Sequence, residues 1–226
     1  MVESGPRQAI VWAFAVPVFA LLCLWQFRSA APLSRVTLFS VVFVILVTVA
    51  GAEQAHVFLR SAMRSEATLK EAIGANYDRA LIQAVIIMSF FDYIYLIEYA
   101  HWHLVPALER GTLQWMGVAA AMASLLILGW ADRWLSRHFA DDESAKRIMT
   151  GGPYRFMRHP RYTAILLGKL AAPLLLGSVI AWIVFVVWIY LIFQRIQREE
   201  PHLQDLFGTA YEVYASRTAR LIPGVY

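Results

Sequence analysis

Two short polar segments of this chain carry residue types suited to chemistry, and each borders a long apolar run. The first, residues 151–162, reads Gly-Gly-Pro-Tyr-Arg-Phe-Met-Arg-His-Pro-Arg-Tyr. The second, residues 195–200, reads Arg-Ile-Gln-Arg-Glu-Glu. Guanidinium groups bind carboxylates and phosphates, whereas carboxylates accept hydrogen bonds from hydroxyl and ammonium groups. Because charge at the edge of a bilayer is costly and usually functional, the two segments predict a binding site.

Within the first segment, Gly-Gly-Pro indicates a turn, and His159 precedes a proline. A residue before proline is steered away from helical geometry, so we expect the histidine to lie at a helix start. Free N–H groups at a helix N-terminus favour carboxylates and phosphates. The same composition also fits an interfacial anchor, in which arginines and aromatic rings only fix the chain at the membrane surface.

Within the second segment, Glu199 and Glu200 end a long apolar stretch. Carboxylates at a helix C-terminus oppose the helix dipole, so they are not there for helix stability. Adjacent residues do not share a helix face, which predicts that one carboxylate faces a pocket while the other pairs with Arg195 or Arg198. A solvated charge cluster is the alternative. Further on, spacing of three places Tyr211 and Tyr214 on one face of an expected helix.

The elements that must position these segments are membrane helices. Of the 226 residues, 59% are hydrophobic and 16% are charged, whereas soluble domains carry about 25% charge. The single cysteine, Cys23, excludes an internal disulfide. A span needs about 20 apolar residues. The sequence predicts an all-α integral membrane protein whose four N-terminal transmembrane helices cover residues 9–27, 36–58, 80–99 and 113–131.

Two further elements follow the polar segment. Residues 162–193 are mostly apolar but too long for one straight span, and they contain Pro173 and Gly177-Ser178. We therefore expect a C-terminal helical hairpin with its turn near 173–178. Residues 201–218 mix apolar, aromatic and acidic side chains, which is typical of an amphipathic interfacial helix.

The distribution of Lys and Arg predicts orientation. With these spans, 16 of the 20 Lys and Arg residues lie on one side of the membrane. Such asymmetry places both termini, and both polar segments, in the cytoplasm of a multi-pass protein. The net charge of +4 is therefore read as this bias plus contact with anionic membrane lipids, and no nucleic-acid partner is expected.

The order of residues resembles a known superfamily, that of the isoprenylcysteine carboxyl methyltransferases and phospholipid methyltransferases. The resemblance covers about residues 151–223, one third of the chain. It implies S-adenosylmethionine as methyl donor, bound in a cytoplasm-facing cavity. The matching residues are Gly152-Pro153-Tyr154-Arg155, Arg158-His159-Pro160-x-Tyr162, Arg198-Glu199-Glu200, Leu203, Phe207-Gly208, Tyr211, Tyr214 and Arg220-Leu-Ile-Pro223.

The resemblance also implies residue roles and a division of a single membrane domain, residues 1–226. Residues 1–131 would be a variable transmembrane bundle, and residues 132–226 the cofactor-binding, catalytic part. Arg158, Arg195, Glu200 and Arg220 are candidate catalytic residues, the arginines for a substrate carboxylate or phosphate or for the cofactor carboxylate. The cofactor would be lined by Tyr154, His159, Pro160, Tyr162, Glu199, Glu200 and Tyr211.

The expected partner is a lipophilic methyl acceptor that enters from the bilayer. A prenylated cysteine carboxylate, a lipid amine and a hydrophobic thiol all remain open. One alternative is an NADPH-dependent enzyme similar to membrane sterol reductases. Another is a transporter or scaffold, for which Asp92 and Lys169 would form the path. No metal is expected at Glu98, His101 and His103, because a fourth ligand is not apparent.

Overall fold

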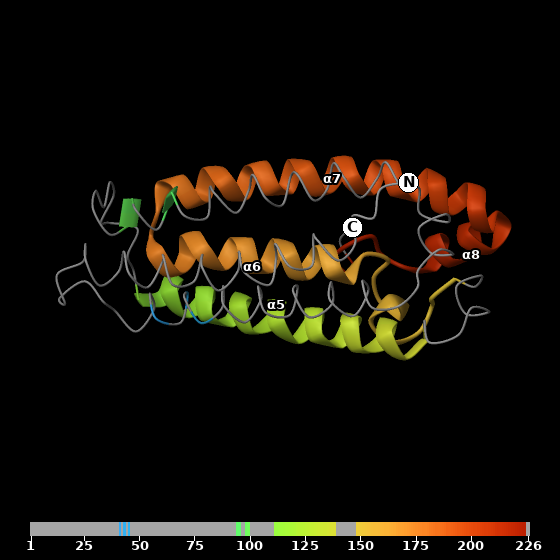
Figure 1. Cartoon of the computed structure of the whole chain (residues 1–226), viewed down its shortest axis with the longest axis horizontal. Coiled ribbons are helices and arrows are strands. Elements are labelled where there is room, and N and C mark those ends of the chain that lie inside the picture. The colour runs from blue at the N-terminus through green and yellow to red at the C-terminus, as the bar shows by residue number, and fades with distance from the viewer. Residues whose placement is uncertain are drawn as a thin grey trace, which may run out of the picture. The chain divides into compact units, whose positions relative to one another are not determined.

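The computed structural model describes residues 111–138 and 148–224, together with residues 41, 43, 45, 94, 95, 98 and 99. Every regular element in these ranges is helical, as predicted (Figure 1). The first three predicted spans lie almost wholly outside them, as do Asp92, His101 and His103. The elements are α5 (Gly111–His138), the 3₁₀ helix η5 (Gly152–Arg155), α6 (Pro160–Leu176), α7 (Val179–Phe207) and α8 (Thr209–Arg217).

Two of the described helices are long and apolar enough to cross a membrane. They are the Gly111–Leu135 part of α5 and the whole of α7, Val179–Phe207. The first contains the fourth predicted span, residues 113–131. In addition, α5 continues to His138, so the predicted polar segment after residue 131 begins as helix. In length and apolar composition, these two helices agree with the predicted membrane protein.

Small residues bring α5 and α6 close together. The buried face of α5 includes Ala121, Ser124 and Leu128, which are spaced three and four residues apart. The Ser124 hydroxyl donates a 2.7 Å hydrogen bond to the main-chain carbonyl of Ala164 in α6. A methyl group on Gly168 would lie 2.9 Å from the Ser124 oxygen. Small side chains and interhelical hydrogen bonds are what lets helix backbones approach one another in membranes.

The contacts between α6 and α7 show that these helices run antiparallel. Near the start of α6, Tyr162 bonds to Glu199, and further along α6 the Lys169 ammonium lies 4.9 Å from the ring centroid of Trp188. The break between the helices falls at Gly177 and Ser178, within the predicted range 173–178. Gly177 has a φ of 62°, a conformation that favours glycine.

The C-terminal part differs from the prediction. One amphipathic helix was expected over residues 201–218, but α7 continues through Pro201 to Phe207, and α8 begins only at Thr209. The break occurs at Gly208, whose φ is 56°. The helix can pass through Pro201 because a proline removes only one main-chain donor from a helix that carries many. The left-handed glycine redirects the chain instead.

The residues that matter for chemistry belong to one compact unit, formed by Ala119–Ala171 and Trp182–Tyr226. The predicted division of the chain at residue 131 stays a prediction. Within this unit, α5, α6 and α7 bring the polar ends of three helices to the side on which α8 lies (Figure 1).

Candidate active site

The first polar segment is held by a tryptophan of α5. The indole of Trp134 lies against the two glycines of the turn, where a methyl group on either Gly151 or Gly152 would approach it to 2.4 Å. Gly152 also has a φ of 57°. Only glycine suits such a position, because it lacks the Cβ atom and tolerates positive φ. The Gly-Gly pair is therefore required for Trp134 to clamp η5, whose Pro153 is buried.

The start of α6 is joined to the C-terminal segment by main-chain pairing. The Arg158 amide donates to the Ala219 carbonyl at 2.8 Å, and the His159 amide donates to the Arg220 carbonyl at 3.0 Å. One turn into α6, the Thr163 hydroxyl donates to the Leu221 carbonyl at 2.8 Å. As expected, His159 lies just before the first residue of α6. The C-terminal segment thus forms part of the same structure as the histidine.

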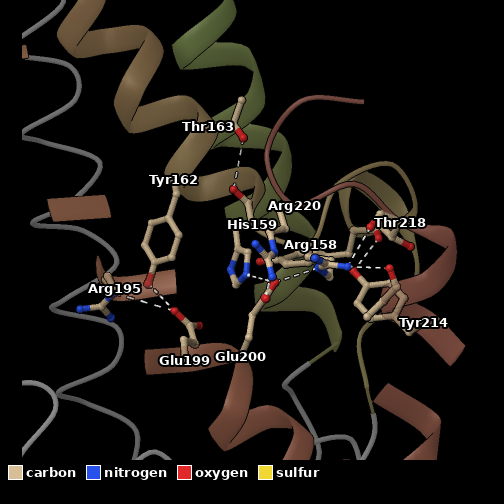
Figure 2. A network of polar contacts seen from close by, with 12 residues as sticks. Arg158, His159, Tyr162, Thr163, Arg195, Glu199, Glu200, Tyr214, Thr218 and Arg220 are labelled. Atoms are coloured by element: carbon tan, nitrogen blue, oxygen red, sulfur yellow. Dashed lines mark hydrogen bonds and ion pairs between the residues drawn. The ribbon is translucent and has the colours of Figure 1, made fainter. Parts of the chain in front are cut away.

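Glu200 lies at the centre of a cluster of cationic side chains (Figure 2). Its Oε1 atom accepts a hydrogen bond from Arg158 Nε at 3.0 Å, and its Oε2 atom lies 3.0 Å from Arg220 Nε. His159 Nε2 lies 3.4 Å from Oε1, beyond the usual length of a hydrogen bond. Only 13% of the Glu200 side chain is exposed. Both of its oxygens are therefore engaged by the protein itself.

Glu199 contacts different residues from those that surround Glu200. The Tyr162 hydroxyl donates to Glu199 Oε2 at 2.6 Å and accepts a hydrogen bond from Arg195 Nε. Arg195 Nε also lies 4.0 Å from the same carboxylate oxygen, one helical turn away. The Glu199 side chain is 30% exposed. The two adjacent glutamates thus differ in partners and in access, as their positions on different helix faces predicted.

His159 links the two groups. Its ring stacks on that of Tyr162, with centroids 5.4 Å apart and planes inclined by 20°. The histidine is buried, and its Nε2 atom has no partner at hydrogen-bonding geometry in the described structure. The nitrogen faces Oε1 of Glu200, 3.4 Å away. This contact with His159 is one of the causes that lower the pKa of Glu200.

Arg158 is turned toward the protein. Besides Glu200, it contacts the end of α8, where its Nη1 atom donates to the carbonyls of Ala215 at 2.6 Å and Thr218 at 3.0 Å. Carbonyl groups at a helix C-terminus have no intrahelical partner, and a cation there also complements the helix dipole. Only 10% of the Arg158 side chain is exposed. Each of these hydrogen bonds of the guanidinium is made to the chain itself.

Three tyrosines surround the cluster outside the long helices. The Tyr214 hydroxyl donates to the Tyr154 carbonyl at 2.7 Å, which ties α8 to η5. Burial raises the pKa of both Tyr154 and Tyr211 to about 12, and burial likewise raises the pKa of Tyr214. These phenols therefore stay protonated at neutral pH. The Tyr211 hydroxyl is buried without a hydrogen-bond partner among the described residues.

The structure brings together the site residues that the two polar segments predict. Pro160 is buried as the first residue of α6, a position that suits proline. Sequence reasoning missed Trp134, Thr163 and the carbonyls of Ala215 and Thr218. It also missed an ion pair of 3.0 Å between Asp132 and Arg161, which joins α5 to α6. No local pattern marks these contacts, because most of them join segments distant in sequence.

Comparison with known proteins gives matches in the same part of the chain. The phospholipid methyltransferase family model matches residues 111–210. A protein-S-isoprenylcysteine O-methyltransferase of Dictyostelium discoideum is 26% identical over 62% of this chain and 60% of its own length. A second, from Arabidopsis thaliana, is 34% identical over 37% of this chain and 43% of its own length.

A methanethiol S-methyltransferase of Bradyrhizobium diazoefficiens is 36% identical over 39% of this chain and 31% of its own length. The chain thus matches less than two thirds of each of these relatives. No solved structure gives a significant match. The matched region contains the turn at Gly151–Gly152, the His159-Pro160 helix start and the Glu199-Glu200 pair. Through this region the chain is similar to isoprenylcysteine and phospholipid methyltransferases.

Proposed function

We propose that this protein transfers a methyl group from S-adenosylmethionine to a lipophilic acceptor at the cytoplasmic surface of a membrane. The observation that carries the proposal is the convergence of two unequal carboxylates, Glu199 and Glu200, with His159 and Tyr162 at the polar ends of α6 and α7. The methyltransferases named above support the reaction class. The cofactor supplies a methyl group already activated on a sulfonium.

The described residues fit such a cofactor. One buried polar atom of the cluster, Tyr211 Oη, has no hydrogen-bond partner in the described structure, and it would gain one from a polar ligand. Glu199 is the carboxylate best placed for hydroxyl or ammonium groups, because it is more exposed than Glu200. Tyr162 and Arg195 hold this carboxylate in one orientation. Glu200, whose two oxygens contact Arg158 and Arg220, holds the surrounding residues in place.

The charge of the cluster favours an anionic acceptor atom. In the described part of the chain, the three guanidinium groups of Arg158, Arg195 and Arg220 contact two carboxylates, those of Glu199 and Glu200. The excess positive charge stabilises a carboxylate or thiolate and disfavours a lipid ammonium group. A carboxylate acceptor also needs no base, whereas an amine or thiol must lose a proton. The names of the relatives fit this preference, since they specify methylation at oxygen and at sulfur.

The position of the cluster suits a meeting of water-soluble and lipophilic reactants. The apolar part of α7 reaches Phe193, and the polar cluster begins two residues later at Arg195. A lipophilic acceptor would reach the cluster from the bilayer, and the cofactor would enter from the cytoplasm, where we place both termini of a multi-pass chain. Desolvation and alignment of the two reactants are then the main contributions of the protein.

Binding of S-adenosylmethionine to the purified protein in detergent or nanodiscs, measured by calorimetry, tests the proposal. We expect binding that Glu199→Ala and His159→Ala weaken. Labelled cofactor incubated with a membrane lipid extract should give a labelled lipophilic product, whose chemistry identifies the acceptor. Absence of binding by the intact protein would refute the proposal. Binding of NADPH in its place would support the reductase alternative.

A further inference from the structure

The nine-residue helix α8 is held by a turn at its start and by side-chain contacts with residues distant in sequence. Gly208 redirects the chain before it, Tyr214 bonds to the main chain of η5, and Arg158 bonds to the last carbonyls of the helix. A helix this short is not stable by itself, because nucleation is costly and few hydrogen bonds follow. Its position in the site therefore depends on these features, together with the hydrogen bond that Gln204 of α7 donates to Glu212 of α8.

The side chain that α8 presents to the cluster is Tyr211. Only 5% of this residue is exposed, and its hydroxyl has no hydrogen-bond partner in the part of the chain that the structure describes. Leaving a buried hydroxyl without a partner opposes stability, so a structural role alone would be better served by phenylalanine. The hydroxyl is more simply explained as a ligand contact whose position α8 must hold.

We infer that Arg158 is a positioning residue that acts through α8, placing the Tyr211 hydroxyl for the cofactor proposed above. The inference rests on that proposed function. Arg158 does not need to touch the ligand for this role: Nε engages Glu200 while Nη1 engages the carbonyls of Ala215 and Thr218. It therefore couples the second carboxylate of α7 to the far end of α8.

The guanidinium group explains why arginine is needed. Its N–H groups point in fixed, different directions, so one side chain donates to the carboxylate and to two helix carbonyls at once. A lysine would keep the charge beside Glu200 but concentrate its donors on one flexible ammonium. Arg158→Lys should therefore preserve the fold while loosening α8. This separates the role of positioning from that of charge.

A double-mutant cycle tests the inference. Arg158→Lys and Tyr211→Phe should each weaken S-adenosylmethionine binding by roughly tenfold, the scale of one lost hydrogen bond to a charged or buried group. The double variant should bind little worse than either single variant, because both remove the same contact. Additive losses would overturn the inference. Tyr211→Phe should leave the melting temperature unchanged or raised, unlike the loss of a merely structural side chain.

Hydrogen exchange of α8 gives a readout that does not depend on the cofactor. Arg158→Lys should raise amide exchange across Thr209–Arg217, whereas the matched control Arg217→Lys, at an exposed position on the same helix, should not. Unchanged exchange in Arg158→Lys would refute the positioning role even if the cofactor binds. If the wild type binds no cofactor but exchange rises as expected, the proposed function fails and the role of Arg158 in holding α8 stands.

Discussion

Tyr162 of α6 donates its phenolic hydrogen to Glu199 of α7 across 2.6 Å, and the same oxygen accepts from Arg195. One hydroxyl therefore joins two helices and aligns a carboxylate and a guanidinium. Beside it, Glu200 joins the same helix α7 to the start of α6 and to the C-terminal segment. The neighbouring residues Glu199 and Glu200 thus belong to two separate hydrogen-bonded clusters. Glu199 is the more exposed to solvent, and Glu200 is the more buried.

Substitution of Glu199 or Tyr162 should weaken ligand binding more than it weakens the fold. Glu199→Gln and Tyr162→Phe each remove part of one hydrogen-bonded group, and we expect cofactor affinity to fall about tenfold or more, about 1.4 kcal/mol. Calorimetry and thermal unfolding of the same samples separate the two effects. Asp205→Asn, at an exposed site on α7, is the control. Equal affinities in all variants would contradict the assignment of Glu199.

Substitution of Glu200 should act mainly on stability. Glu200→Ala leaves Arg158 and Arg220 close together without their shared counter-ion, and breaking a largely buried ion pair costs about 3–5 kcal/mol. We expect a large fall in the free energy of unfolding, together with faster proteolysis of the C-terminal segment. Glu200→Gln keeps one acceptor oxygen and should fall between wild type and Glu200→Ala. A Glu200→Ala variant as stable as wild type would contradict the stabilising role assigned to Glu200.

Two glycines provide a matched test of the turn. Gly152→Ala forces a methyl group to within 2.4 Å of Trp134 at a φ of 57°, so we expect a loss of at least about 1–3 kcal/mol from strain and displaced packing. Gly129→Ala in α5 meets nothing within 4 Å and should be neutral or stabilising by about 0.5–1 kcal/mol. Unfolding measurements on both variants check the difference. Similar losses of stability in the two variants would contradict the close packing of Trp134 against the glycine turn.

The stability of the protein at high pH should depend on the raised pKa of its buried tyrosines. Burial raises the pKa of Tyr154 and Tyr211 from 10.0 to about 12, so the folded state retains protons that the unfolded state releases. Their contribution to stability is therefore complete below pH 10 and is lost as the pH rises toward 12. Melting temperatures of wild type and the Tyr154→Phe, Tyr211→Phe double variant should diverge in this window. Parallel curves would contradict the prediction.

Local patterns predicted much of what positions the site. His159-Pro160 begins α6 because proline suits a first helical turn. The break at Gly177 was visible as a glycine between two apolar runs. The different surroundings of Glu199 and Glu200 followed from helix geometry alone. In each case the residues that determine the structure lie within a few positions of one another.

The contacts that sequence reasoning missed are long-range. Arg158 was a candidate to bind a ligand anion, but it contacts Glu200 and two main-chain carbonyls. Every residue has such a carbonyl, so a sequence does not show which one is the partner. The parallel pairing of Met157 with Ala219 involves main-chain atoms, which leave no residue signature. The apolar helix was expected to end at Glu200 but continues to Phe207, and the positive φ of Gly208 leaves no sequence pattern that would have shown this.

The pairing of Met157 with Ala219 also has a consequence for biogenesis. The Arg158 side chain reaches carbonyls 57 and 60 residues later in the chain. A ribosome that has completed α6 must therefore add α7, α8 and the segment beyond before His159 gains its neighbours. Contacts of such separation form late, after the loop-closure entropy of the intervening chain has been overcome. The helices can form first, and the site closes only after Leu221 has been added.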